Sequence, residues 1–192
     1  LVSGKPTQDS RLAINLFIGS LPIIPVGLLL KDVVEINLRS IAVIAITTIA
    51  FGLLLLLADM KGRQTRADTE LTWRQALLIG FAQCFALVPG TSRSGVTMTA
   101  ALFCGFNRES ASRISFLLSI PAIAGAATLK TIDLVSSDLS VDWLTLALGC
   151  SLSAISAYVC IRLFLNVINQ LGFLPFVIYR LVLGTALIAL LL

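Results

Sequence analysis

Long runs without charge constrain this chain more than any other feature of its sequence. Uncharged stretches of roughly membrane-spanning length occupy Leu12–Leu30, Ile41–Ala58, Ile114–Leu129 and Trp143–Ile161. A further apolar stretch, Phe173–Leu192, is interrupted only by Arg180. The chain is 57% hydrophobic and 12% charged, whereas soluble domains average about 25% charged residues. The sequence therefore predicts an all-α, polytopic transmembrane helical bundle that forms a single transmembrane domain, with spans at about 12–30, 41–58, 114–129, 143–161 and 173–192.

One apolar stretch has a length that fits neither one span nor two. Gln75–Asn107 contains a single charge, Arg93, and is broken by Pro89, Gly90 and Gly95. One spanning helix needs about 20 residues and two need about 40. Two half-length helices that meet at the break fit better, so residues 75–107 are predicted to form a re-entrant helical hairpin.

The charges of the flanking loops agree with a hairpin. Basic residues are frequent in 59–74, Arg108 and Arg113 follow the hairpin, and the loop Lys130–Asp142 carries three aspartates against one lysine. Cytoplasmic loops of membrane proteins carry an excess of Lys and Arg. A re-entrant hairpin places both basic segments on the cytoplasmic side, the acidic loop outside, and the tip of the hairpin toward the outer face.

Local signals predict several boundaries. Pro22 and Pro25 predict a kink within the first span. The charges of Lys31–Arg39 indicate a short loop, and Asn166–Gly172 reads as a tight polar turn. Thr72, directly before Trp73, is typical of a helix N-cap.

The tip of the hairpin has the composition of an anion site. Arg93 lies among hydroxyls and glycines, namely Gly90, Thr91, Ser92, Ser94 and Gly95. Guanidinium, hydroxyl and backbone N–H donors together suit a phosphate, and an arginine within a membrane indicates a functional site. The alternative is a simple helix break whose arginine reaches the headgroups.

Three further polar residues, Gln83, Thr97 and Arg180, have alternative interpretations. Thr97 shares a helix face with Arg93, or bonds back to helix carbonyls as Thr99 is expected to do. Gln83 orients a group at the tip, or bonds a neighbouring helix. Arg180 snorkels or is buried and paired, with membership of the site as the minor alternative.

The composition limits the chemistry. Histidine is absent, so the usual general base is missing, and a nucleophilic Ser92 would need a base beside it. The four cysteines lie in apolar runs without metal-ligand spacing and are interpreted as packing residues. The chain therefore offers no metal ligands of its own. The net charge of +4 is explained by loop topology and requires no nucleic-acid partner.

Three segments resemble one known family. Pro89–Gly95 (PGTSRSG) looks like the second signature of the bacterial undecaprenyl-diphosphate phosphatases, and Phe116–Ala126 (FLLSIPAIAGA) and Phe173–Arg180 (FLPFVIYR) are also similar to that family. The resemblance extends from about Arg11 to the C-terminus. It implies hydrolysis of undecaprenyl or another polyprenyl diphosphate to the monophosphate, in the bacterial inner membrane, with the site facing outward. This reaction recycles the lipid carrier for cell-wall synthesis and is linked to bacitracin resistance.

The resemblance also assigns roles. Arg93, Ser92 and Ser94 would be catalytic, and Thr91, Gly90, Gly95, Thr97 and Gln83 would bind the substrate. The family's other signature, a Glu-rich hairpin ending in Ser-Ser-Thr-Gly-His, is absent from these 192 residues. The chain therefore looks like the C-terminal two-thirds and one half of an inverted repeat. A divalent metal such as Mg²⁺ or Ca²⁺ would be held mainly by residues outside it, and the chain alone is expected to be inactive.

Two other classes stay open from the sequence. Broken helices in inverted repeats are also transporter architecture, so a transporter or lipid flippase half is the main alternative. A structural fragment without activity is the third. The expected partners are the polyprenyl diphosphate and membrane lipids, with a homodimer as an option and no nucleic acid.

Overall fold

The chain is helical through most of residues 7–62, 65–136 and 142–191, which are the residues that the computed structural model describes. In order the elements are α1 (Gln8–Ser20), α2 (Ile23–Asn37), α3 (Ile41–Lys61), the 3₁₀ turn η1 (Asp68–Glu70), α4 (Trp73–Cys84), the 3₁₀ turn η2 (Phe85–Leu87), α5 (Arg93–Phe103), α6 (Arg108–Val135), α7 (Trp143–Leu171) and α8 (Leu174–Ala189). The predicted all-α class is confirmed.

Four segments among the described residues are long and apolar enough to cross a membrane. They are Gln8–Leu30, Ile41–Lys61, Arg108–Val135 and Trp143–Leu171. Leu174–Ala189 is apolar but shorter, with 16 residues. The chain is therefore a membrane protein with several spanning helices.

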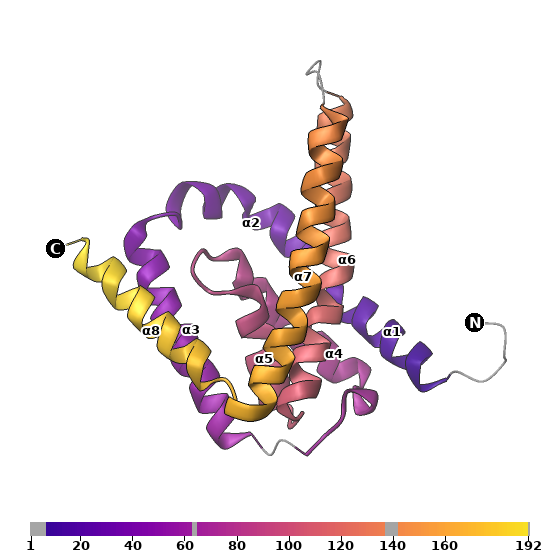
Figure 1. The fold of residues 1–192 in the computed structure, drawn as a ribbon, viewed down its shortest axis with the longest axis vertical. Coiled ribbons are helices and arrows are strands. Elements are labelled where there is room, and N and C mark those ends of the chain that lie inside the picture. Colours follow the sequence, from indigo (N-terminus) through magenta and orange to yellow (C-terminus); the bar gives the residue numbers. More distant parts are fainter. Residues whose placement is uncertain (1–6, 63–64, 137–141, 192) are drawn as a thin grey trace.

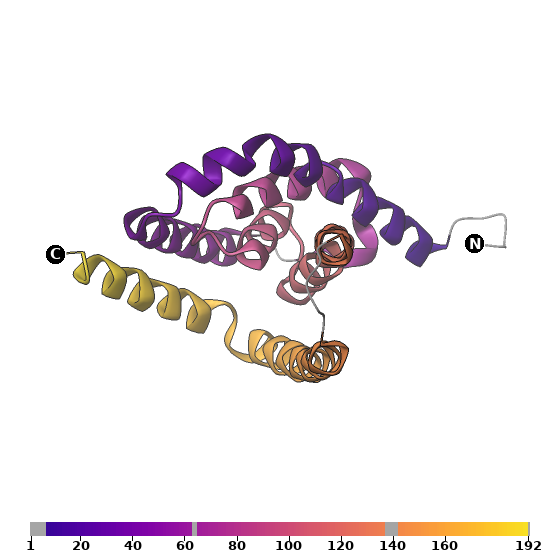
Figure 2. The same ribbon diagram turned by 90° about the horizontal axis from the view of Figure 1, so that it is seen from above.

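The short helices α4 and α5 lie at the centre of the molecule. The long helices α6 and α7 overlap in the view of Figure 1, but Figure 2 shows α7 set apart from α6, whereas α3 and α8 lie side by side in both views. From above, the arc of α1, α2 and α3 passes along one side of α4 and α5, and α7 and α8 run along the other (Figure 2). The loop between α4 and α5 is thus enclosed by longer helices.

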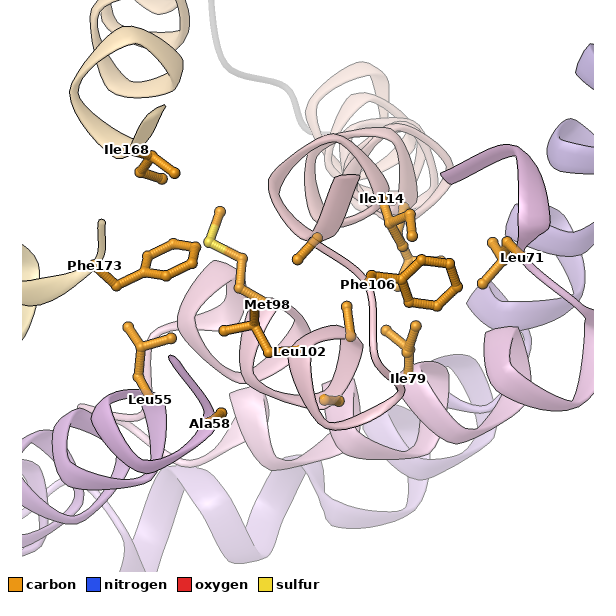
Figure 3. Packing of buried hydrophobic residues seen from close by; sticks show 14 of the residues in the cluster. Leu55, Ala58, Leu71, Ile79, Met98, Leu102, Phe106, Ile114, Ile168 and Phe173 are labelled. Atoms are coloured by element: carbon orange, nitrogen blue, oxygen red, sulfur yellow. The ribbon is translucent and has the colours of Figure 1, made fainter. Parts of the chain in front are cut away.

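Close contacts of small residues hold the central helices together. A side chain at Gly80 of α4 would overlap the carbonyl of Gly19 in α1, so both positions need glycine. Small residues are favoured between membrane helices because they let backbones approach closely. Larger side chains, including Ile79, Met98, Leu102 and Phe106, fill the space between α4, α5 and their neighbours (Figure 3).

The helices extend beyond the apolar runs that predicted them. α2 continues to Asn37, so the loop predicted at 31–39 is wrong over most of its length. α7 continues to Leu171, and the predicted polar turn is reduced to the positive-φ residue Gly172 (φ 66°). Charged and polar residues mark where a helix leaves an apolar medium, but the helix can continue beyond them. A helix ends where its backbone hydrogen bonds end. Residues 137–141 of the predicted acidic loop lie outside the described residues.

The prolines near residue 22 separate two helices. The sequence predicted a kink within one span, whereas α1 ends at Ser20 and α2 begins at Ile23, with a turn at Leu21–Pro22. Proline lacks an N–H donor and removes a helical hydrogen bond. At this position the loss ends the first helix.

The two ends of the segment that holds α4 and α5 lie side by side. Arg66, before α4, forms an isolated parallel bridge with Phe106, after α5. The Arg66 N–H donates to Gly105 O at 3.1 Å, and the Asn107 N–H donates to Arg66 O at 3.0 Å. The chain therefore enters and leaves this segment at the same place.

Candidate active site

The helix α4 leads into the tip loop, which we define as residues 88–92. Its start is fixed as predicted, because Thr72 and Gln75 form a capping box in which the Gln75 N–H donates to Thr72 Oγ1 at 3.4 Å. After α4 the 3₁₀ turn η2 reverses the chain, and Gly90 adopts φ +86°. A Cβ at Gly90 would also collide with the Ile44 backbone of α3. The site therefore needs glycine at this position for two reasons.

Two threonines of α3 hold the tip loop. Thr47 Oγ1 donates to Pro89 O at 2.6 Å, and Thr48 Oγ1 donates to Gly90 O at 3.2 Å. These carbonyls cannot join a helix because the loop interrupts it. The hydroxyls of α3 supply the donors that the loop carbonyls need inside the molecule.

Ser92 starts α5 in a strained conformation. Its φ is +64°, and it alone among the described residues other than glycine has a positive φ. Its Oγ accepts the Gly95 N–H at 3.3 Å, so it is the N-cap of α5. Positive φ in a residue with a side chain is uncommon and tends to be kept at functional sites.

Arg93, the first residue of α5, is anchored along one edge of its guanidinium. Nε and Nη2 both donate to Oε1 of the fully buried Gln83, at 3.1 and 3.0 Å, and Nη2 also donates to Leu118 O in α6 at 3.0 Å. Nη1 has no hydrogen-bond partner within the described part of the chain. Gln83 thus bonds Arg93 at the start of the neighbouring helix α5, a contact that agrees with both interpretations of Gln83.

The threonines of α5 are engaged within the protein. Thr99 Oγ1 donates to Gly95 O at 2.7 Å, as predicted. Thr97 is buried, with its hydroxyl 2.7 Å from Ser115 Oγ and 3.1 Å from Arg93 O. Of the two interpretations of Thr97, the contacts favour back-bonding to the helix.

Arg180 of α8 reaches the tip loop from the opposite side. Its side chain is buried, with Nε donating to Thr48 O at 3.2 Å and Nη2 donating to Gly90 O at 2.9 Å and Thr91 O at 3.1 Å. Of the alternatives that the sequence left open, burial with pairing is the one observed. The partners are backbone carbonyls, not a carboxylate.

A cavity of about 370 Å³ adjoins the tip loop between α3, α5, α7 and α8. Its polar end is formed by Thr48, Gly90, Ser92, Ser94, Gly95 and Arg180. The rest is apolar and includes Leu55, Met98, Phe164, Phe173, Phe176 and Leu183. Figure 3 shows Met98 and Phe173 facing each other above Leu55. The volume is in the range of ligand sites, which are mostly apolar with a few polar groups.

The structure divides the predicted site residues into three groups. Gly90, Ser92, Ser94 and Gly95 line the cavity. Arg93 and Gln83 bond each other and are not part of its lining. Thr91 and Thr97 are fully buried, and Thr91 Oγ1 has no hydrogen-bond partner in the described residues.

Thr48 was not considered as a site residue from the sequence, and membership of the site was only the minor alternative for Arg180. Thr48 carries the weak signal of a hydroxyl pair, Thr47–Thr48, inside an apolar span. Arg180 is easier to find in the sequence because it is a charge within an apolar helix. That pattern indicates a buried group but does not identify its partners.

The tip does not fit a metal ion by itself. Hydroxyls, amides and guanidinium groups surround it, whereas divalent ions are bound mainly through carboxylates, imidazoles or thiolates. Within residues 7–62, 65–136 and 142–191, no three such side chains are grouped as a metal site. We therefore derive no chemical step through a metal bound to these residues.

Comparisons with known proteins identify the family of the chain. The family model described as bacitracin resistance protein BacA matches residues 2–186. Undecaprenyl-diphosphatase 1 of Pseudoalteromonas translucida (strain TAC 125) is 55% identical over 182 residues, which cover 95% of this chain and 68% of the relative. Undecaprenyl-diphosphatase of Chromohalobacter salexigens is 52% identical over 185 residues, 96% of this chain and 70% of the relative.

The fold and site define a polytopic helical membrane protein with a broken helix pair at its centre and a serine- and arginine-containing tip. The chain belongs to the bacitracin resistance protein BacA family.

Proposed function

We propose that this chain serves the hydrolysis of undecaprenyl diphosphate to the monophosphate and phosphate. One observation carries the proposal: Ser92 and Ser94 lie at the polar end of a cavity whose other walls are apolar. A lipid diphosphate is likewise polar at one end and apolar at the other, because it joins a charged diphosphate head to a prenyl chain. Membership of the family and the names of the two relatives support the same reaction.

The tip supplies donors for the diphosphate. Ser92 and Ser94 line the cavity, and the N–H groups at the start of α5 favour an anion. Arg93 adds a guanidinium whose Nη1 has no hydrogen-bond partner in the described residues. Donors fixed before the reaction stabilise the charge that grows on the phosphate oxygens in the transition state. Gly90 and Gly95 let the backbone approach the substrate, and Thr91, Thr97 and Gln83 act from behind by fixing the loop and Arg93.

We further propose that α4 and α5 form a re-entrant hairpin in the bacterial inner membrane. They have 12 and 11 residues, about 18 and 16 Å at 1.5 Å per residue, too short for a hydrocarbon core of about 30 Å. The pairing of Arg66 with Phe106 supports entry and exit on one side. With the basic ends of the hairpin on the cytoplasmic side, the tip and its site face outward, and the segment forms half of an inverted repeat.

The 192 residues alone are proposed to bind a diphosphate weakly and to hydrolyse it negligibly. The sequence has no histidine, and the tip carries no carboxylate, so no group beside Ser92 can take its proton. The general base and the ligands of a divalent ion such as Mg²⁺ would come from the Glu- and His-containing hairpin typical of the family.

Phosphate release in detergent tests the proposal. The chain is co-expressed with a segment carrying that hairpin and given undecaprenyl diphosphate. We expect release of one phosphate per lipid and accumulation of the monophosphate. Movement of the lipid between leaflets of reconstituted vesicles without phosphate release would instead identify a flippase. Normal turnover by the 192 residues alone would contradict our assignment of the catalytic groups.

A further inference from the structure

The side chain of Arg180 is a buried charge that has no carboxylate partner among the residues that the structure describes. It lies within the apolar helix α8 and is 8% exposed. A buried guanidinium is costly unless its donors are satisfied. The hydrogen bonds found for it go to backbone carbonyls: Thr48 O in α3, and Gly90 O and Thr91 O in the tip loop.

The surrounding helix is shaped around this side chain. Gly52 of α3 lies against the base of Arg180, where an added Cβ would be 3.3 Å from Arg180 Cβ. An added Cβ at Gly95 would be 3.3 Å from Arg180 Nη1. Glycine at both positions thus leaves room for the arginine between α3 and α5.

We propose that Arg180 is the positioning residue of the diphosphate site. By bonding the carbonyls of Gly90 and Thr91 it fixes the last turn of the tip loop, and this sets where Ser92 and Ser94 enter the cavity. The role of the two serines rests on the proposed function, whereas the clamp rests on the contacts of Arg180 alone.

The fork shape of the guanidinium is what the clamp requires. Nε and Nη2 point in fixed directions from one plane, which lets a single side chain bond α3 and the tip loop at once. A lysine keeps the charge but presents its donors from one point. A glutamine removes the buried charge, and its shorter side chain carries two donors on a single nitrogen in place of the arginine fork. Both substitutions should therefore release the tip loop.

Hydrogen exchange at the tip tests this directly in the full chain. The amides of Thr91, Gly95 and Val96 are hydrogen-bonded, at 3.3, 3.3 and 3.0 Å from their acceptors. We expect exchange of these amides to be at least about 10-fold faster in Arg180→Lys and Arg180→Gln, because release of the loop opens these bonds locally. Exchange in α4 and α6 should stay as in the parent. Arg162→Lys, at an exposed arginine of α7 stacked on Tyr158, is the matched control and should change nothing.

A second readout separates positioning from direct charge. Binding of farnesyl diphosphate, the probe, to the chain co-expressed with the Glu- and His-containing hairpin should weaken by about 10-fold in both variants, which is about 1.4 kcal/mol. If the Lys variant still bound farnesyl diphosphate and the Gln variant did not, Arg180 would act through its charge and not through its shape. That result would overturn the proposal. Equal acceleration of exchange in α3, α8 and the tip would show a merely structural role and also overturn it. Because Gln removes the buried charge, that variant is expected to insert even if the Lys variant does not fold. Faster tip exchange without any diphosphate binding by the parent would leave the clamp intact and reject the proposed function.

Discussion

Arg93 and Gln83 form a two-bond contact, with Nε and Nη2 of the arginine donating to one amide oxygen at 3.1 and 3.0 Å. The edge of the guanidinium that could bind a phosphate through two parallel bonds is therefore held by a neutral side chain. Gln83 Nε2 is buried and has no hydrogen-bond partner in the described residues. A neutral partner can fix the direction of Arg93 without cancelling its charge.

Replacing Gln83 with Glu should change stability and binding in opposite directions. The carboxylate would pair with Arg93 by charge-assisted hydrogen bonds, worth about 1.5–3 kcal/mol each, and would raise the melting temperature or leave it unchanged. It would also neutralise Arg93, so binding of farnesyl diphosphate should weaken by 10-fold or more. Binding by titration calorimetry and melting in the same detergent provide the two measurements. Unchanged affinity would show that Arg93 does not bind the diphosphate.

Residues 59–74 and 107–113 should be reached by reagents from the same, cytoplasmic side. In the structure these loops touch, because Arg108 Nε lies 2.6 Å from Asp59 Oδ1 and Arg66 pairs with Phe106. Single-cysteine variants at Lys61, Asn107 and Ser137 are treated with a membrane-impermeant thiol reagent, once in inverted and once in right-side-out vesicles. Lys61 and Asn107 should react together and Ser137, which lies outside the described residues, from the other side. If the cysteines at positions 107 and 137 were labelled from the same side of the membrane, the re-entrant hairpin would be rejected.

Asp59→Asn should destabilise the protein where α3, α6 and α8 meet. Asp59 accepts two bonds from Arg108, at 2.6 and 3.1 Å, and the Phe173 N–H at 3.4 Å, so it joins α3, α6 and α8. Arg108 is partly exposed and can be solvated, so we expect a loss of about 1–3 kcal/mol, measured as a lower melting temperature. The control is Asp133→Asn in the exposed Lys130–Asp133 pair, which should cost less than about 1 kcal/mol. Equal effects of the two changes would show that Asp59 does not join these helices.

The sequence predicted much of this fold because apolar runs and their interruptions have direct physical causes. The helix break before Arg93 follows from Pro89 and Gly90, and Ser92 caps α5 near the predicted start of the second short helix. Helix ends were predicted less well: α7 continues past Arg162 because hydropathy reports the medium around a helix, not its hydrogen bonds.

The partners of the two arginines could not be predicted in the same way. Arg180 lies far along the chain from Thr48 and Gly90, and no local pattern encodes that contact. For Arg93, Gln83 was identified as a site candidate, but the bonds of the guanidinium to Gln83 and to Leu118 O depend on the packing of α4 against α5 and α6.

Phosphate release by Arg93→Lys tests the central claim most directly. The chain, co-expressed with the Glu- and His-containing hairpin, is compared with Arg93→Lys and with the exposed control Arg162→Lys at equal membrane abundance. Lysine cannot reproduce the planar fork that bonds Gln83 and Leu118 and that we propose also binds a phosphate. We therefore predict a kcat about 10²-fold lower for Arg93→Lys, the scale of a lost oxyanion donor. The control should stay within about twofold of the parent, since an exposed arginine away from the site contributes little. Activity of Arg93→Lys equal to that of the parent would contradict the assignment of Arg93 and its tip as the diphosphate site.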